Sequence, residues 1–156
     1  MSNITIRPAN IDEVETLQKL NDEVFIDNAK YDEDLRMDWA HSEDGGKKYF
    51  TDLLSDNESI CLFAEVEGKI IGYIAASHKE ISYRNSKYIE IDNMGVVPEY
   101  RSVGIGKRLM EECIRIAKNR GFQKVFVNAY FQNTKAIDFY KRNGFSEIDV
   151  SLEKNI

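Results

Sequence analysis

Residues 96–109 read VVPEYRSVGIGKRL, and they join a β-rich run to an amphipathic helix through a turn that contains Gly104 and Gly106. Neither glycine has a Cβ, so the backbone there can approach a ligand closely and adopt positive φ angles. The unpaired N–H groups at the start of the following helix point outward, and the helix dipole favours negative charge at that end. The stretch therefore predicts a binding site for an anionic group such as a diphosphate.

Two other glycine motifs do not fit this stretch. A phosphate-binding P-loop needs a glycine five residues before Gly106 and a serine or threonine after Lys107, where the chain has Arg108. A dinucleotide fingerprint needs a third small residue where Leu109 stands, and it normally lies near the start of a βαβ unit. The remaining alternative is that the glycines only shape a surface connection between a strand and a helix.

The pattern RxxGxG over residues 101–106, after Val96-x-Pro98, resembles the acetyl-CoA diphosphate loop of the GNAT superfamily of N-acetyltransferases. A second pattern, NxxAxxxYxxxGF over residues 133–145, resembles the C-terminal motif of the same superfamily, at the expected distance after one helix and one strand. Two motifs in the right order are more specific than one. By element order the resemblance covers the chain from about Ile4 to Val150, although residues 27–56 match nothing specific.

The chain has 156 residues, of which 42% are hydrophobic, so we expect residues 1–156 to form a single domain. Cys61 and Cys113 are unclustered and lie in apolar runs, which predicts buried, reduced thiols and a cytoplasmic protein rather than a disulfide. His41 and His78 lack metal-binding spacing, so no metal is predicted. The most apolar stretch, residues 70–76, is too short to span a bilayer, and no membrane partner is expected.

The formal net charge of −6 is divided unevenly along the chain. Residues 1–93 hold 10 basic and 20 acidic side chains, whereas residues 94–156 hold 11 basic and 7 acidic ones. The positive half contains the glycine turn, as an anionic cofactor would favour, and the negative half could attract a cationic substrate. Two solvated faces would give the same division. Nucleic-acid binding is disfavoured, because no basic stripe with interleaved aromatic residues is present.

Hydrophobic periodicity and turn residues predict the elements in the order β-α-α-β-β-β-α-β-α-β. The segments are a strand at 4–6, a helix from about 12 to 25, a helix at 47–54, a hairpin of 59–67 and 69–79, a strand at 88–96, a helix from 105 ending at Gly121, a strand at 124–130, a helix at 134–143 and a strand at 145–152. This order predicts an α/β fold with a mixed sheet. The resemblance implies a mostly antiparallel sheet flanked by helices, in which the strands at 88–96 and 124–130 splay apart to form the acetyl-CoA cleft.

The resemblance also implies which residues bind the cofactor, acetyl-CoA. Backbone amides of residues 94–96 would bind the pantetheine arm and polarise the thioester carbonyl, with Gly95 permitting an irregular strand. Asn133 would cap the last helix and contact the pantetheine arm. The predicted cofactor-binding set is Met94, Gly95, Val96, Arg101, Ser102, Val103, Gly104, Ile105, Gly106, Lys107, Asn133 and Tyr140.

Acetyl transfer to an amine needs a proton donor for the departing thiolate and a group that removes a proton from the ammonium. Tyr140 occupies the superfamily's usual general-acid position, although Phe139-Tyr140 on a helix also reads as core aromatics. Asp92 is the first choice as base and Glu90, on the same strand face by alternation, is the second. Both could equally be solvated carboxylates. Ribosomal-protein acetyltransferases place a base where this chain has Asn128, which argues against that subclass.

The acceptor site is predicted in the acidic, aromatic segment 31–39, where the superfamily usually builds one wall of that site. Carboxylates and aromatic faces can bind a cation, although a solvated helix and loop would have the same composition. The candidate substrate-binding residues are Tyr31, Asp34, Trp39 and Tyr83. The sequence does not specify the amine, which we expect to be a cationic small molecule or peptide.

The predicted function is direct transfer of an acetyl group from acetyl-CoA to a primary amine, in a ternary complex. The alternative is a non-catalytic acyl-CoA sensor that keeps the nucleotide cleft, and the third option is a structural interaction domain. Homodimers are common in the superfamily, so a homodimer is a possible state for this chain as well.

Overall fold

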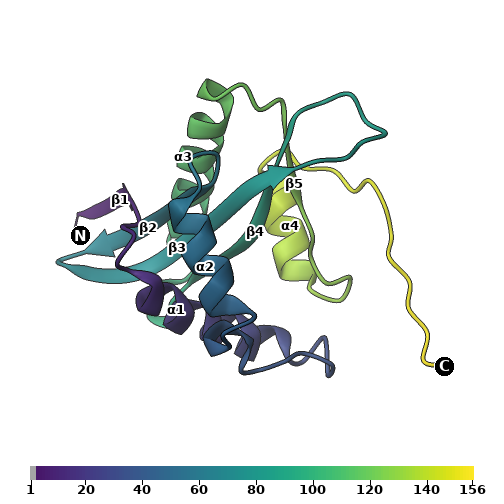
Figure 1. The fold of residues 1–156 in the computed structure, drawn as a ribbon, viewed down its shortest axis with the longest axis horizontal. Coiled ribbons are helices and arrows are strands. Elements are labelled where there is room, and N and C mark those ends of the chain that lie inside the picture. Colours follow the sequence, from purple (N-terminus) through teal and green to yellow (C-terminus); the bar gives the residue numbers. More distant parts are fainter. Residues whose placement is uncertain (1–2) are drawn as a thin grey trace.

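The computed structural model describes residues 3–156, so that Met1 and Ser2 of the predicted domain lie outside the described residues. One five-stranded sheet has helices on both faces, with the strands in the order β1-β2-β3-β4-β5 (Figure 1). The elements are β1 (Ile4–Pro8), α1 (Val14–Asn28), η1 (Trp39–His41), α2 (Gly46–Ser55), β2 (Ile60–Val66), β3 (Lys69–Lys79), β4 (Tyr88–Val96), η2 (Pro98–Tyr100), α3 (Ile105–Asn119), β5 (Lys124–Val127) and α4 (Thr134–Arg142).

Local turn chemistry sets several of these boundaries. The β2–β3 hairpin reverses at Glu67 and Gly68, whose φ angles are 49° and 79°, as a two-residue turn that follows the twist of the strands requires. Gly104, with a φ of 89°, immediately precedes α3, and Gly121, with a φ of 86°, follows its end. The predicted hairpin and α3 are therefore confirmed.

Two apolar clusters hold the helices to the sheet. On one face, α3 buries Ile105, Leu109 and Cys113 against residues from β2, β3 and β4. On the other face, Leu17 of α1 and Phe50 of α2 pack on a cluster from β2 and β3. The sheet is thus the middle layer of three (Figure 1).

The sheet is mixed, because β1 to β4 pair antiparallel whereas β5 runs parallel to β4. The β4–β5 ladder extends only from the pair Tyr88–Lys124 to the pair Ile91–Val127. Residues 92–96 of β4 therefore continue past the last pairing with β5. This observation confirms the predicted mostly antiparallel sheet flanked by helices, with strands that part at one end.

A β-bulge interrupts β4 at Asp92. Ala75 of β3 lies opposite Asn93, whereas the next residue, Ala76, lies opposite Ile91, so Asp92 is the extra residue. A bulge shifts the alternation of side chains by one position. The cluster around α3 accordingly contains Ile91 before the bulge and Met94 after it.

The sequence-based prediction is wrong for the last strand. Residues 145–152 have no regular secondary structure, and Ile148, Val150 and Leu152 are 58%, 73% and 93% exposed. The prediction for 124–130 is also too long, because β5 ends at Val127. Beyond it, the Tyr130 hydroxyl donates a hydrogen bond to Asp32 at 2.6 Å and the Asn133 amide bonds back to the Tyr130 carbonyl. Alternation alone forms no strand where no neighbouring strand pairs with it.

Within residues 3–156, no helix combines the length and the apolar character needed to cross a bilayer.

Candidate functional site

The glycine turn before α3 exposes backbone amides. Gly104 adopts a left-handed conformation, and nothing lies within 4 Å of the point where its Cβ would be. The first intrahelical bond of α3 runs from the Arg108 amide to the Gly104 carbonyl, so the amides of residues 105–107 have no partner within the helix. The open turn and these amides fit a diphosphate.

Gly106, the second glycine of the turn, faces α4 and β4. Its Cβ would lie 3.6 Å from Cζ of Phe139 in α4 and 3.7 Å from Cε of Met94 in β4, which is ordinary van der Waals contact. The two positions of the turn therefore favour glycine for different structural reasons. Gly104 is required by its backbone angle, whereas Gly106 lies where α3, α4 and β4 converge.

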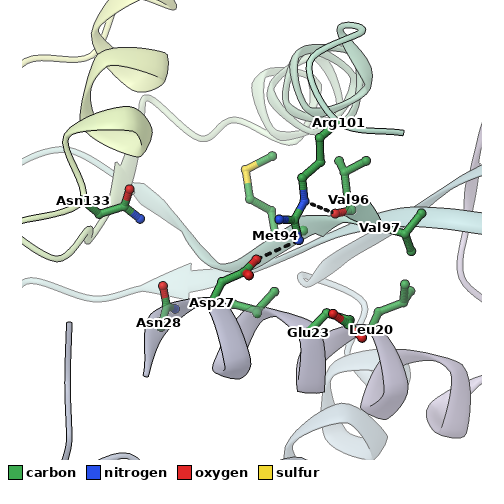
Figure 2. Close-up of a pocket in the computed structure, with 11 residues that line it drawn as sticks. Leu20, Glu23, Asp27, Asn28, Met94, Val96, Val97, Arg101 and Asn133 are labelled. Carbon is green, nitrogen blue, oxygen red and sulfur yellow. Dashed lines mark hydrogen bonds and ion pairs between the residues drawn. The ribbon is translucent and has the colours of Figure 1, made fainter. Parts of the chain in front are cut away.

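A cavity of about 180 Å³ opens at the end of β4, between α1 and the start of α4 (Figure 2). The structure brings five of the predicted cofactor-binding residues together in its lining, namely Met94, Gly95, Val96, Arg101 and Asn133. The rest of the lining is Val97 and five residues of α1, which are Leu20, Glu23, Val24, Asp27 and Asn28. Sequence reasoning missed these α1 residues, although Leu20–Val24 and Glu23–Asp27 have the i, i+4 spacing that puts each pair on one helix face.

Arg101 closes one side of the cavity. Its Nε donates to the Val96 carbonyl at 2.7 Å, and its Nη2 lies 2.7 Å from Oδ2 of Asp27 (Figure 2). The guanidinium thus ties the loop after β4 to the last turn of α1. Two of its five N–H donors have partners in these contacts, whereas the amides of residues 105–107 have none within the helix.

Gly95 is a point of close packing between β4 and α1. A Cβ at Gly95 would lie 2.7 Å from Cγ2 of Val24, which is closer than real Cβ contacts come. The irregularity of β4 that was predicted at Gly95 lies instead at Asp92. Gly95 allows the close packing of α1 because it has no side chain.

Asn133 and Tyr140 are held by α4. The Asn133 side chain accepts a hydrogen bond from the Ala136 amide at 3.2 Å, which confirms its predicted role as helix cap. The Tyr140 ring packs edge-on against Phe139 and Phe145, with centroid separations of 5.3 and 5.4 Å. Burial raises the pKa of Tyr140 to about 12, so the phenol keeps its proton at neutral pH. Within residues 3–156 its hydroxyl has no hydrogen-bond partner.

The two candidate bases differ in their surroundings. Oδ2 of Asp92 accepts hydrogen bonds from the Tyr49 hydroxyl at 2.5 Å and the Ser77 hydroxyl at 2.7 Å. Glu90 lies 3.6 Å from the Lys79 ammonium, and burial, opposed by that ammonium and reinforced by Asp92, raises the pKa of Glu90. A raised pKa makes a carboxylate a stronger proton acceptor. Neither carboxylate lines the cavity, so their roles as bases stay predictions.

Tyr49 is a further residue that sequence reasoning missed. Burial first, and then the neighbouring Asp92, raise the pKa of Tyr49 well above its ordinary value, so it remains a hydrogen-bond donor to that carboxylate. The two residues are 43 positions apart, and no local signal in the sequence connects them.

A buried polar cluster lies on the same side of β4. Nδ2 of Asn21 donates to Oδ1 of Asn93 at 2.7 Å and to the Tyr73 hydroxyl at 3.1 Å. These bonds fix α1 to β3 and β4, since buried polar groups that are hydrogen-bonded hold their partners in defined positions.

The four candidate substrate-binding residues are not brought together around the cavity. Tyr31 stacks on Tyr130 at 6.0 Å, and Asp34 is exposed in the same loop. Trp39 stacks on Phe25 at 5.6 Å and packs among the aromatic residues of α2. Tyr83 is 87% exposed in the β3–β4 loop. Their roles in binding an acceptor stay predictions.

Cys61 and Cys113 are free thiols, and burial raises the pKa of each to about 12. A thiol with such a pKa is a poor nucleophile at neutral pH. Among residues 3–156, no group of three or more histidine, cysteine, aspartate or glutamate side chains is placed to hold a metal ion.

Comparison with known proteins matches most of the chain to one protein family. The model of the family described as "Acetyltransferase (GNAT) family" matches residues 17–145. An N-acetyltransferase of Methanocaldococcus jannaschii, described as uncharacterised, is 37% identical over 103 residues, which are 65% of this chain and 46% of that protein. An N-alpha-acetyltransferase of Sulfurisphaera tokodaii is 26% identical over 153 residues, which are 93% of this chain and 81% of that protein.

A solved structure shares the fold. The aminoglycoside N-acetyltransferase AAC(6′)-Iy in complex with CoA superimposes with a TM-score of 0.79 at 19% identity, covering 100% of this chain and 96% of that one. The match therefore extends over all the helices and strands of this fold.

Proposed function

The chain belongs to the acetyltransferase (GNAT) family, and we propose that it transfers an acetyl group from acetyl-CoA to a primary amine of a small molecule or peptide. One observation carries the proposal. Five residues that the family resemblance predicts to bind the cofactor line a single cavity at the parted end of β4 and β5, and they include Val96 and Arg101 of the first motif and Asn133 of the second. A surface connection that happened to contain glycines would not bring Asn133 of the second motif to the same place.

Binding of the cofactor rests mainly on backbone groups. The diphosphate binds the unpaired amides of residues 105–107 and the amides of the exposed turn that precedes them. The pantetheine arm fits between β4 and β5, where residues 92–96 have no strand neighbour on the β5 side. There the backbone of residues 94–96 pairs with the arm as a neighbouring strand would.

The chemistry needs a proton removed from the acceptor before the attack and a second one removed after it. The amine nitrogen forms a bond to the thioester carbonyl carbon, the carbon–sulfur bond breaks, and the leaving sulfur takes a proton from Tyr140. The nitrogen, now bonded to the acetyl carbon, releases its extra proton to water, and the Tyr140 phenolate takes a proton back from water. The ammonium form of the acceptor, with a pKa near 10.4 for an alkylamine, first gives a proton to Asp92 or Glu90, directly or through water. Tyr49 and Ser77 hold the Asp92 carboxylate in place for this step.

The acceptor approaches along the C-terminal end of α1. Glu23 brings a carboxylate into the cavity lining, while Asp27 beside it is paired with Arg101, and the last turn of α1 contains no basic residue. A helix C-terminus carries partial negative charge, which adds to the attraction for a cation. A cationic amine is therefore the substrate class that this side of the cavity fits best.

The first experiment measures turnover and binding separately. Purified protein is incubated with acetyl-CoA and a panel containing a polyamine, an aminoglycoside and a peptide with a free α-amino group. We expect release of CoA thiol together with acetylated amine, detected by mass spectrometry. Acetyl-CoA binding without turnover on any amine would favour the acyl-CoA sensor, and absence of both would remove the proposed function.

The second experiment tests the carboxylates. Glu23→Gln should raise KM for cationic amines with little change in kcat, because it removes attraction and not chemistry. Asp92→Asn and Glu90→Gln should lower kcat, the larger loss identifying the base. Glu15→Gln, at an exposed position in the first turn of α1, is the matched control and should change neither parameter. Unchanged kcat in both base variants would rule out carboxylate catalysis.

A further inference from the structure

The wall of the cavity that α1 forms combines carboxylates with apolar side chains. Four of its residues recur at helical spacing on one face of α1, namely Leu20, Glu23, Val24 and Asp27. Met94 adds apolar surface from the β4 side. An acceptor that enters here meets negative charge and apolar surface side by side, so the number of unpaired carboxylates decides how many ammonium groups it can carry.

The carboxylates that neighbour this wall in the sequence already have partners. Oδ2 of Asp22 lies 2.6 Å from Nε2 of His41, and Oδ2 of Asp32 accepts a hydrogen bond from the Tyr130 hydroxyl at 2.6 Å. The half-buried Glu23 differs from them, because within residues 3–156 its side chain takes part in no hydrogen bond or ion pair. Glu23 is therefore available to bind a cation.

Asp27, the second carboxylate of the lining, is neutralised by Arg101. Nη2 of the guanidinium lies 2.7 Å from Oδ2 of Asp27, and Nε donates to the Val96 carbonyl at 2.7 Å (Figure 2). The bond to Val96 holds the guanidinium in place, whereas an exposed ion pair alone contributes little. The lining thus contains two negative charges and one positive charge, and Glu23 carries the net negative charge.

The cavity is also small. Its volume of about 180 Å³ lies below the roughly 300–1,000 Å³ that is usual for pockets of drug-sized ligands. A molecule with several ammonium groups would have to place one of them against Leu20, Val24 or Met94, and burying a charge beside apolar side chains is costly unless the charge has a partner. One free carboxylate provides a partner for one ammonium group only.

We propose that the acceptor is a primary monoamine with an apolar group close to its nitrogen. Glu23 binds the ammonium, and the apolar group packs on Leu20 and Val24 of the same wall. The Arg101–Asp27 pair sets this specificity, because it removes the second negative charge that a diamine would need. The inference rests on the proposed function and narrows its substrate class. An alkylamine and the first residue of a peptide share this chemistry.

The test compares two matched pairs of acceptors. Pentylamine ends in a methyl group, whereas cadaverine has the same length and ends in a second ammonium. Two tripeptide amides, one beginning with leucine and one with lysine, make the same comparison in a peptide. In a pair that is acetylated, kcat/KM for the apolar member should be higher by about tenfold or more. NMR titration of the protein without acetyl-CoA should give the same order of Kd. Turnover of one pair only would identify the acceptor as a small amine or a peptide.

Variants then change the charge of the cavity. Arg101→Gln frees Asp27 and gives the lining two negative charges, so the preference for pentylamine over cadaverine should fall about tenfold. Asp27→Asn leaves no net negative charge, so both amines should bind more weakly. The double variant restores one negative charge and should restore the preference. Arg115→Gln, which removes the same charge from an exposed ion pair on α3, is the matched control. A ratio between two amines does not change when acetyl-CoA affinity falls.

The other outcomes separate this inference from the proposed function. Equal or better use of cadaverine and of the lysine peptide would overturn the inference, and so would acetylation of a polyamine or an aminoglycoside with no turnover of the apolar amines. In both cases acetyl transfer itself would stand. No turnover on any amine would remove both. A preference that Arg101→Gln leaves unchanged would overturn the role of the ion pair. Circular dichroism checks that each variant is folded, and the comparison on the unmodified protein depends on no variant.

Discussion

The two helices that flank the parted end of the sheet, α3 and α4, are packed very differently. α3 buries Ile105, Leu109, Met110, Cys113 and Ala117 against the strands, whereas none of the nine residues of α4 is fully buried. The turn before α3 presents the amides for the cofactor, while α4 carries the proposed acid. If the proposed roles are right, substitutions on α3 should change stability and cofactor binding, whereas substitutions on α4 should change turnover.

The largest effect is expected from Tyr140→Phe on α4. Loss of a general acid should lower kcat by about 10²–10⁴-fold. The free energy of unfolding and the Kd for acetyl-CoA should hardly change, because the hydroxyl has no hydrogen-bond partner within residues 3–156. Steady-state kinetics at saturating acetyl-CoA and urea denaturation provide the two readings. Turnover equal to that of the unmodified protein would remove Tyr140 from this role.

The second-largest effect is the loss in free energy of unfolding when an apolar side chain is truncated, which should be larger on α3 than on α4. Leu109→Ala removes a fully buried side chain from α3 and should lower the free energy of unfolding by about 2–5 kcal/mol. Ile137→Ala makes a comparable truncation at a half-buried position of α4 and should cost less than half as much. Denaturant titrations of both variants make the comparison, and equal losses would show that the packing difference has no energetic weight.

A smaller effect separates the two glycines of the turn. Gly104→Val forces a β-branched residue into a left-handed conformation, at a cost of about 1–3 kcal/mol, and should weaken acetyl-CoA binding roughly tenfold or more. Gly106→Ala adds a Cβ at ordinary contact distance from Phe139 and Met94 and should weaken it less. Isothermal titration calorimetry on folded protein gives both values. A wild-type Kd for Gly104→Val would contradict the assignment of this turn to the diphosphate.

The smallest effect is a pH dependence of the free energy of unfolding that arises from Glu90 of β4. Burial raises the pKa of Glu90 in the folded protein above its unfolded value, so between these two values the folded state binds more protons. Its contribution to stability is therefore present below the unfolded pKa and is lost as the pH rises through the folded pKa. Glu90→Gln lacks this loss, and its stability relative to the unmodified protein should increase from acid to neutral pH. Asp138→Asn, at an exposed position of α4, is the control, and the same trend in both variants would contradict the burial argument.

Features that depend on nearby residues were predicted well from the sequence. The helix from Ile105 was predicted because its apolar residues repeat at helical spacing and Gly104 and Gly121 mark its ends. The β2–β3 hairpin was predicted from the turn residue Gly68. The last strand was not, because a strand needs a neighbour, and alternation in residues 145–152 does not say whether one is available within the same chain.

The candidate site divides in the same way. Motifs identified Val96, Arg101 and Asn133, which the structure places around one cavity. The α1 side of that cavity and the bond between Tyr49 and Asp92 depend on contacts between residues far apart in the sequence. No single-sequence pattern specifies such contacts, since they are set by how α1 and α2 pack on the sheet.

The width of the cavity depends on how closely two apolar lining residues, Gly95 of β4 and Val24 of α1, pack together. A single methyl group added at Gly95 of β4 has no room beside Val24 of α1. Alanine at position 95 would move α1 away from β4 unless position 24 held a smaller residue. The residues at positions 24 and 95 together therefore set the distance between α1 and β4, and with it the width of the cavity.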